Sequence, residues 1–148
     1  MFYSGMFNSE SFTLPPQVIY KKNLSSDSGL HDQIKIYMND EDMLTADIIA
    51  EGQKYKNGDL IVLKMEDCDT AKVGLIQSIL IRERKVYFIC KVYTCVRNWL
   101  QYFESVTCDE VCTFYESDKL ADYKPLVKRG TTVKFVFFMH HRVSFAYK

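Results

Sequence analysis

The amino-acid sequence predicts a mainly β fold: one small antiparallel β-barrel or strongly bent sheet of about seven to ten strands, with one or two short helices. Three β-rich segments follow one another between residues 60 and 93, separated by short polar connections. Aromatic residues make up 14% of the chain, and their flat rings pack well across a pleated sheet. A chain of 148 residues also has the length of one domain.

The central part of the chain predicts a strand followed by a hairpin. Asn57-Gly58 is a strong turn signal, and it precedes the apolar strand Leu60–Leu63. Val73–Ile81 and Val86–Tyr93 are rich in β-branched and aromatic residues, so they predict two paired strands. The polar segment Arg82–Lys85 connects them.

Residues 1–11 predict a flexible N-terminal arm, and residues 12–148 predict the single β-rich domain. Within that domain, Gln17–Lys21 predicts a short strand and Asn23–Gly29 a loop. Gln33–Met38 alternates apolar with polar side chains, which predicts a half-buried strand. After a turn, Leu44–Ile49 predicts the return strand, with a single helical turn as the alternative.

The pattern weakens after the central hairpin. Thr94–Ser105 has apolar residues at helical spacing, so a short helix and a broken strand both remain open. Glu110–Tyr115 reads as extended, and Leu120–Leu126 as a connector. Thr131–Met139 and Arg142–Ala146 predict a last pair of strands.

The net charge is zero, but the charges are unevenly distributed. Residues 1–70 carry six basic and twelve acidic residues, a net charge of −6, whereas residues 71–148 carry thirteen basic and seven acidic residues, a net charge of +6. Such asymmetry fits a face for an anionic partner. We favour the plainer interpretation that the two halves pack against each other within one core.

The five cysteines and the start of the chain predict an intracellular protein with reduced thiols, because their number is odd and no basic-then-apolar leader follows Met1. The apolar run Val133–Met139 contains Lys134 and is too short to span a bilayer, so we expect no membrane association.

No catalytic motif is evident, and we predict no enzyme activity and no cofactor. The chain has no phosphate-binding glycine loop, helix-borne zinc motif or nucleophile elbow. We interpret the acidic run Asp40–Asp42 as a solvated turn and not as a magnesium site. A zinc site can be drawn from four cysteines and three histidines, but the cysteine spacings are wider than usual knuckles, so we predict no metal. The set is Cys90, Cys95, Cys108, Cys112, His31, His140 and His141.

Two groups of side chains predict binding. The first is a set of aromatic residues around the irregular segment, which in an aromatic cage would hold a methylated lysine by cation–π attraction: Tyr93, Trp99, Tyr102, Phe103 and Tyr115. For Trp99 itself we favour a second role, as a plug in the core. The other group is basic residues interleaved with aromatic ones, suited to a phosphate backbone and stacked bases: Arg82, Arg84, Lys85, Lys124, Lys128, Arg129 and Arg142. Core rings with solvated basic neighbours are the alternative interpretation.

Four short segments carry a resemblance to a known module: Tyr55–Leu63, Val73–Leu80, Val86–Ile89 and Tyr123–Leu126. Their succession resembles the C-terminal module of uncharacterised animal proteins from DNA transposons of the EnSpm/CACTA kind. More loosely, it is similar to a bromo-adjacent homology domain, a β-barrel-like reader of histones and other proteins. The resemblance covers roughly residues 30–145. It implies a nuclear protein associated with chromatin or nucleic acid, and it carries over no catalytic residue.

The sequence therefore predicts a non-enzymatic protein-interaction module, associated with chromatin, that binds a partner protein through a sheet edge or an aromatic surface. The alternative is a nucleic-acid-binding module that uses the basic residues between positions 82 and 142. A homodimer through Val133–Met139 is a further possibility, because an aromatic edge strand is prone to pair with another copy.

Overall fold

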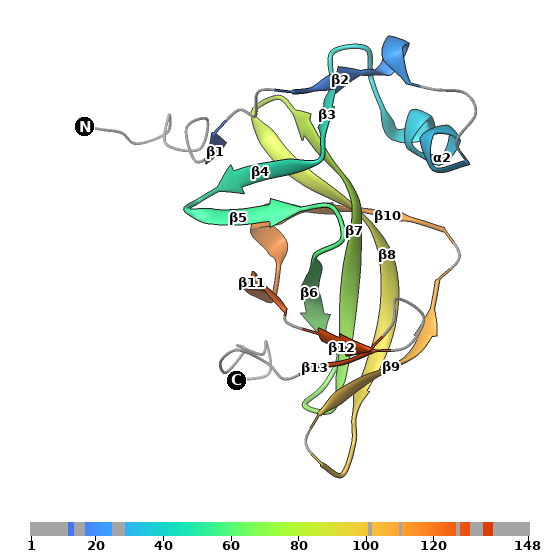
Figure 1. The fold of residues 1–148 in the computed structure, drawn as a ribbon, viewed down its shortest axis with the longest axis vertical. Coiled ribbons are helices and arrows are strands. Elements are labelled where there is room, and N and C mark those ends of the chain that lie inside the picture. The colour runs from blue at the N-terminus through green and yellow to red at the C-terminus, as the bar shows by residue number, and fades with distance from the viewer. Residues whose placement is uncertain are drawn as a thin grey trace.

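The computed structural model describes residues 12–13, 17–24, 29–100, 102–109, 111–126, 128–130 and 135–137. These residues form two antiparallel sheets, one helix and two 3-10 turns (Figure 1), which confirms the predicted mainly β class. No helix among them is both long and apolar enough to cross a membrane. The predicted arm at residues 1–11 lies outside the described residues.

The fold is organised by one long hairpin. Strands β7 (Thr70–Arg82) and β8 (Lys85–Arg97) pair along their whole length, so the predicted hairpin is confirmed and longer than expected. Its turn is made by Glu83 and Arg84, whose φ angles of 49° and 68° are the left-handed values that a tight hairpin turn requires. A β-bulge between Ile76 and Ser78 bends the hairpin.

Each edge of this hairpin is shared by two further strands. Along β7, the strand β6 (Leu60–Met65) pairs with residues 71–75, and the strand β3 (Met43–Thr45) pairs with residues 79–81. Along β8, the strand β9 (Phe103–Cys108) pairs with residues 93–97, and the strand β10 (Thr113–Glu116) pairs with residues 87–90. The two ends of the hairpin therefore pair with different strands.

The remaining strands extend the sheets. β11 (Asp122–Leu126) pairs with β6, while β12 (Lys128–Gly130) pairs with β13 (Phe135–Phe137), which in turn pairs with β9. β2 (Ile19–Tyr20) pairs with β3. The second sheet contains β1 (Phe12–Thr13), β4 (Asp47–Ala50) and β5 (Gln53–Lys56). The 3-10 turns are η1 (Lys21–Asn23) and η2 (Ser117–Lys119).

The strand predicted at Gln33–Met38 is wrong, because these residues belong mostly to the helix α2 (Gly29–Tyr37). Ile34 and Met38 stand four residues apart and are both buried, which is the spacing of one helix face. Ile36, which the alternating pattern placed on the same face, is 81% exposed. Over six residues, apolar positions at i and i+4 fit both the two-residue period of a strand and the 3.6-residue period of a helix, so the pattern did not decide between strand and helix.

Three other segments depart from the prediction. Thr94–Ser105 contains no helix in its described part, because β8 continues to Arg97 and β9 begins at Phe103. Leu120–Leu126 is not merely a connector, since it contains β11. Leu44–Ile49 is divided between β3 and β4 at Ala46. Of the last predicted strand pair, only the part within β13 is described, and Arg142–Ala146 lies outside the described residues.

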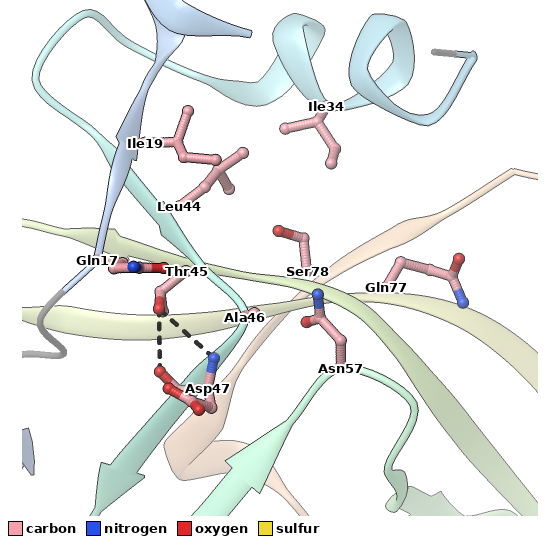
Figure 2. Close-up of a pocket in the computed structure, with 10 residues that line it drawn as sticks. All are labelled: Gln17, Ile19, Ile34, Leu44, Thr45, Ala46, Asp47, Asn57, Gln77 and Ser78. Carbon is pink, nitrogen blue, oxygen red and sulfur yellow. Dashed lines mark hydrogen bonds between the residues drawn. The ribbon is translucent and has the colours of Figure 1, made fainter. Parts of the chain in front are cut away.

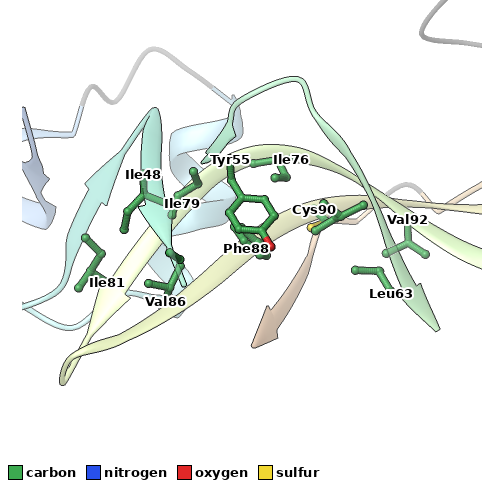
Figure 3. Packing of buried hydrophobic residues seen from close by; sticks show 12 residues of the cluster. Ile48, Tyr55, Leu63, Ile76, Ile79, Ile81, Val86, Phe88, Cys90 and Val92 are labelled. Carbon is green, nitrogen blue, oxygen red and sulfur yellow. The ribbon is translucent and has the colours of Figure 1, made fainter. Parts of the chain in front are cut away.

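The main sheet buries apolar residues on both faces. One face packs against β4 and β5, where Phe88 and Ile79 meet Ile48 and Tyr55 (Figure 3). Ile61 of β6 belongs to the same cluster. The rings of Tyr55 and Phe88 lie 4.9 Å apart between centroids. The bulge matters here, because Ile76 precedes it and Ile79 follows it at an odd spacing, yet both face this cluster. A regular strand would turn one of them away.

The opposite face of the sheet is covered in two places. At one end, α2 places Ile34 and Met38 against Leu80 and Ile89. At the other end, residues of β6, β7, β8, β9 and β11 form a separate cluster: Leu60, Val62, Ala71, Val73, Tyr93, Cys95, Phe103 and Leu126. Both faces of the main sheet are therefore used for burial.

Candidate protein-binding surface

The five aromatic residues predicted to form a binding site do not come together as one cage. Tyr93 and Phe103 are buried in the same core cluster. Tyr115 packs against the cluster on the other face of the sheet, and its hydroxyl donates a 2.9 Å hydrogen bond to the Leu63 carbonyl. Tyr102 is half-buried. These rings close the fold or lie apart, so no cation is enclosed between them.

Trp99 behaves differently from the other four. Its side chain is 86% exposed, so the prediction that it plugs the core is wrong. It lies in the turn after β8, at the lower end of the molecule in Figure 1. Leu100 beside it is also exposed. We refer to Arg97–Leu100 together with Tyr102 as the β8–β9 tip. Helical spacing of the apolar residues suggested burial here, but the chain turns too sharply to form a helix.

The side chain of Asn98 organises the backbone of the tip. Its Oδ1 accepts hydrogen bonds from the backbone N–H groups of Leu100 and Tyr102, at 2.9 and 3.1 Å. Its Nδ2 donates to the Glu104 carboxylate at 2.8 Å. The Asn98 N–H donates to the Tyr102 carbonyl at 2.7 Å. Asparagine readily forms such local bonds in turns. Trp99 is therefore presented on a turn that its neighbours hold in place.

Arg97 joins the tip to the turn between β6 and β7. Its backbone N–H donates to the Asp69 carbonyl at 2.7 Å, and its Nη2 donates to the Cys68 carbonyl at 2.9 Å. Its Nε lies 3.3 Å from the Asp69 carboxylate. The guanidinium also stacks over the Phe103 ring, 4.5 Å from the centroid. These contacts fix the base of the tip without covering Trp99.

The surroundings of the tip are acidic. Residues 66–69, 97–100 and 102–104 contain four carboxylates and one guanidinium, for a net charge of −3. The carboxylates belong to Glu66, Asp67, Asp69 and Glu104. Lys64 offsets part of this charge, because its Nζ lies 3.3 Å from Glu66. The tip thus combines two exposed apolar side chains with a negative rim.

The basic residues predicted for nucleic acid lie in separate settings. Arg82 is bound to Asp42, and the Lys85 ammonium lies 3.7 Å from Glu116. Arg84 is exposed in the β7–β8 turn, while Lys124 is exposed on β11. In Figure 1 that turn is at the upper end of the molecule and β11 is in the lower half. The described part of this set does not form one continuous patch.

The other three members of the basic set lie near the C-terminal end of the chain. Lys128 and Arg129 belong to β12, for which the structure describes the backbone alone, and Arg142 lies outside the described residues. Nucleic-acid binding stays a prediction. So does dimerisation through Val133–Met139, of which the described part is β13, paired with β9 and β12.

The cysteines are free thiols in dissimilar settings. Cys90, Cys95 and Cys112 are buried, whereas Cys68 and Cys108 are exposed. Burial raises the pKa of all three buried thiols, that of Cys95 to about 12, so these three remain protonated near neutral pH. Among the described residues, no group of three potential ligands is placed to hold a metal ion.

The useful residues that sequence reasoning missed are Asn98 and Leu100. The available signal was Asn98-Trp99-Leu100 between two β-rich segments, which is typical of a hairpin turn if the helical spacing is set aside. No protein-family model matches the chain, and neither a curated protein nor a solved structure matches it.

Proposed function

We propose that this protein is a non-enzymatic protein-interaction module that binds its partner through the β8–β9 tip. The observation that carries the proposal is the 86% exposure of Trp99 on a turn held by Asn98 and Arg97. Tryptophan is among the residues most enriched in binding hot spots, because it buries a large area at a small cost in conformational entropy.

The hydrogen bonds of the tip support this role energetically. Association loses free energy when loops and side chains must be ordered on binding. The Asn98 side chain already holds the backbone N–H groups of Leu100 and Tyr102. A partner therefore meets Trp99 beside backbone groups that Asn98 already holds, which lowers the cost of ordering on binding.

The charge of the tip selects the kind of partner. A net charge of −3 on residues 66–69, 97–100 and 102–104 favours a protein with an apolar pocket and a basic rim. The same charge disfavours a phosphate backbone at this place. A basic chromatin component fits this chemistry, and it agrees with the nuclear setting that the sequence resemblance implies.

We also propose that the main sheet closes into a barrel, which forms a rigid base for the tip. β11 pairs with β6, and β12 pairs with β13 at the other end of the strand order. One residue separates β11 from β12 in the chain. Strands that follow each other closely in the chain thus lie at the two ends of the strand order, which supports closure.

Quantitative affinity capture from a nuclear extract tests the proposal. The unmodified protein is compared with Trp99→Ala, and with Ile36→Ala as the matched control, because Ile36 is 81% exposed on α2 at the other end of the molecule. We expect specific proteins to be retained by the unmodified protein and by Ile36→Ala, and lost with Trp99→Ala. Truncating a central aromatic anchor typically weakens binding by about 2 kcal/mol or more.

Two results contradict the proposal. If Trp99→Ala retains the same proteins to the same extent, the tip is not the binding surface. If nuclease treatment removes every captured protein and a mixed-sequence DNA duplex binds directly with a steep salt dependence, the nucleic-acid alternative is correct.

A further inference from the structure

A notch in the edge of β7 forms a second candidate site, at a distance from the β8–β9 tip and independent of it. Along this edge, β6 pairs up to Leu75 and β3 begins to pair at Ile79, so residues 76–78 lie between the two partners. Gly58 N–H and the Ile76 carbonyl close one side at 2.8 Å, and Asn57 N–H donates to the Ala46 carbonyl at 2.8 Å. The space left is a pocket of about 360 Å³ (Figure 2).

The pocket has an apolar and a polar end. Ile19 of β2, Ile34 of α2 and Leu44 of β3 provide the apolar end, which lies toward the helix in Figure 2. Asn57 and Ser78 provide hydrogen-bonding groups below them. Pockets that take small ligands commonly combine apolar walls with a few placed polar groups.

The polar end has unused hydrogen-bonding capacity. Ser78 is 8% exposed, and the bulge after Ile76 places it in the pocket wall. Within the described ranges, neither the Ser78 hydroxyl nor the Asn57 carboxamide makes a side-chain hydrogen bond to another residue. Asn57 is exposed and Ser78 lines the pocket, so a ligand that both donates and accepts can exchange hydrogen bonds with both side chains.

The charge of the lining limits the ligand further. Among the described residues of the lining, Asp47 is the one that is charged, and it is exposed. Thr45 Oγ1, which donates to the Asp47 carbonyl at 3.0 Å, is already engaged. A ligand carboxylate would be repelled by Asp47 and would find no cation among the lining residues that the structure describes. The apolar end, in contrast, is lined by the aliphatic side chains of Ile19, Ile34 and Leu44 and suits an apolar group.

We propose that this notch binds a neutral amide that carries a branched aliphatic group, the chemistry of a leucine residue in a peptide or of a small capped amino acid. The aliphatic group occupies the space between Ile19, Ile34 and Leu44. The amide exchanges hydrogen bonds with Ser78 and Asn57.

Titration of the full chain with N-acetyl-leucinamide, followed by NMR, tests the proposal. We expect saturable shifts of the Asn57 side-chain amide and of the Ile34 and Leu44 methyl signals, with a Kd on the order of 1 mM for a ligand of this size. N-acetyl-glycinamide lacks the aliphatic group and N-acetyl-leucine carries a carboxylate, so both should bind at least about tenfold more weakly.

Variants assign the site. Ser78→Ala should weaken N-acetyl-leucinamide about fivefold, the effect of one lost hydrogen bond. Gln53→Ala, on β5 outside the pocket lining, is the matched control and should leave the affinity unchanged. The capped tripeptide Ala-Leu-Ala distinguishes a peptide ligand from a small capped amino acid. Tighter binding than that of N-acetyl-leucinamide indicates a peptide, and weaker binding indicates a small molecule.

The proposal is overturned if N-acetyl-leucinamide shifts none of these signals at about 10 mM, well above the expected Kd. It is also overturned if the three single-residue probes bind equally. The comparison of the three probes uses only the unmodified chain, so it tests the proposed ligand even if Ser78→Ala fails to fold.

Discussion

Arg82 and Asp42 form a paired contact between the end of β7 and the turn before β3. Arg82 Nη2 lies 2.6 Å from Asp42 Oδ2, and Arg82 Nε lies 3.0 and 3.1 Å from the two carboxylate oxygens. Arg82 Nη2 also donates to the carbonyl of Tyr37, the last residue of α2. Asp42 is 3% exposed. The pair therefore ties the central hairpin to the helix.

The first prediction concerns the stability that this pair provides. Asp42→Asn keeps the size of the side chain but removes its charge, leaving the Arg82 guanidinium without its counterion. We expect the free energy of unfolding to fall by about 2–4 kcal/mol, measured by urea denaturation.

Lys64→Ala is the matched control for that measurement, because it breaks the more exposed pair between Lys64 and Glu66. It should change the free energy of unfolding by less than about 1 kcal/mol. Equal effects of the two substitutions would mean that the Arg82–Asp42 pair stabilises the fold no more than an exposed ion pair does.

The second prediction concerns pH. Burial by itself raises the pKa of Asp42, but hydrogen bonds from Arg82 and from the Asn39 N–H, with the charge of Arg82, outweigh it and hold the pKa below 3.8. Because the folded pKa lies below the unfolded one, this stabilisation is present above pH 3.8 and is lost as the pH falls through the folded pKa. Urea denaturation between about pH 6 and pH 2 should show this loss.

The same series with Asp42→Asn isolates the contribution of this carboxylate. The difference in unfolding free energy between the two proteins should be largest near neutral pH and should shrink in acid. A difference that stays constant down to the lowest pH would contradict the lowered pKa.

The third prediction concerns Gly74 in the middle of β7. A Cβ atom at this position would lie 2.9 Å from both Cβ and Sγ of Cys90, and 3.2 Å from Leu63 Cδ2. Gly74→Ala should therefore destabilise the protein by about 1–3 kcal/mol, measured by thermal or urea unfolding. The double variant with Cys90→Ala should recover only part of the loss, since the Cβ contact remains. Full recovery, or no loss at all, would show that the two strands are less tightly opposed.

The central strands could be predicted from sequence because their signals are local and agree with one another. Val73–Ile81 and Val86–Tyr93 have β-branched and aromatic residues, and the polar Arg82–Lys85 segment permits a turn. Asn57-Gly58 also forms a turn, with a φ of 93° at Gly58. Such features depend on the backbone preferences of a few neighbouring residues.

The helix and the tip could not be predicted in the same way. In the segment Gln33–Met38, most of which belongs to α2, Ile34, Ile36 and Met38 fit a strand. Packing of Ile34 and Met38 against Leu80 and Ile89 favours the helix. For Trp99, size and hydrophobicity favoured burial. Its exposure follows from the length of β8 and from the hydrogen bonds of Asn98, neither of which a pattern of apolar residues contains.

The fluorescence of Trp99 tests most directly whether the tip offers this side chain to a partner, because Trp99 is the single tryptophan of the chain. In the free folded protein, we expect its emission maximum and its quenching by acrylamide to approach those of the urea-unfolded chain. Adding a purified partner obtained by capture should shift the emission to shorter wavelength and reduce the quenching. Emission that is already blue-shifted in the free protein, or that does not change on binding, would contradict the account.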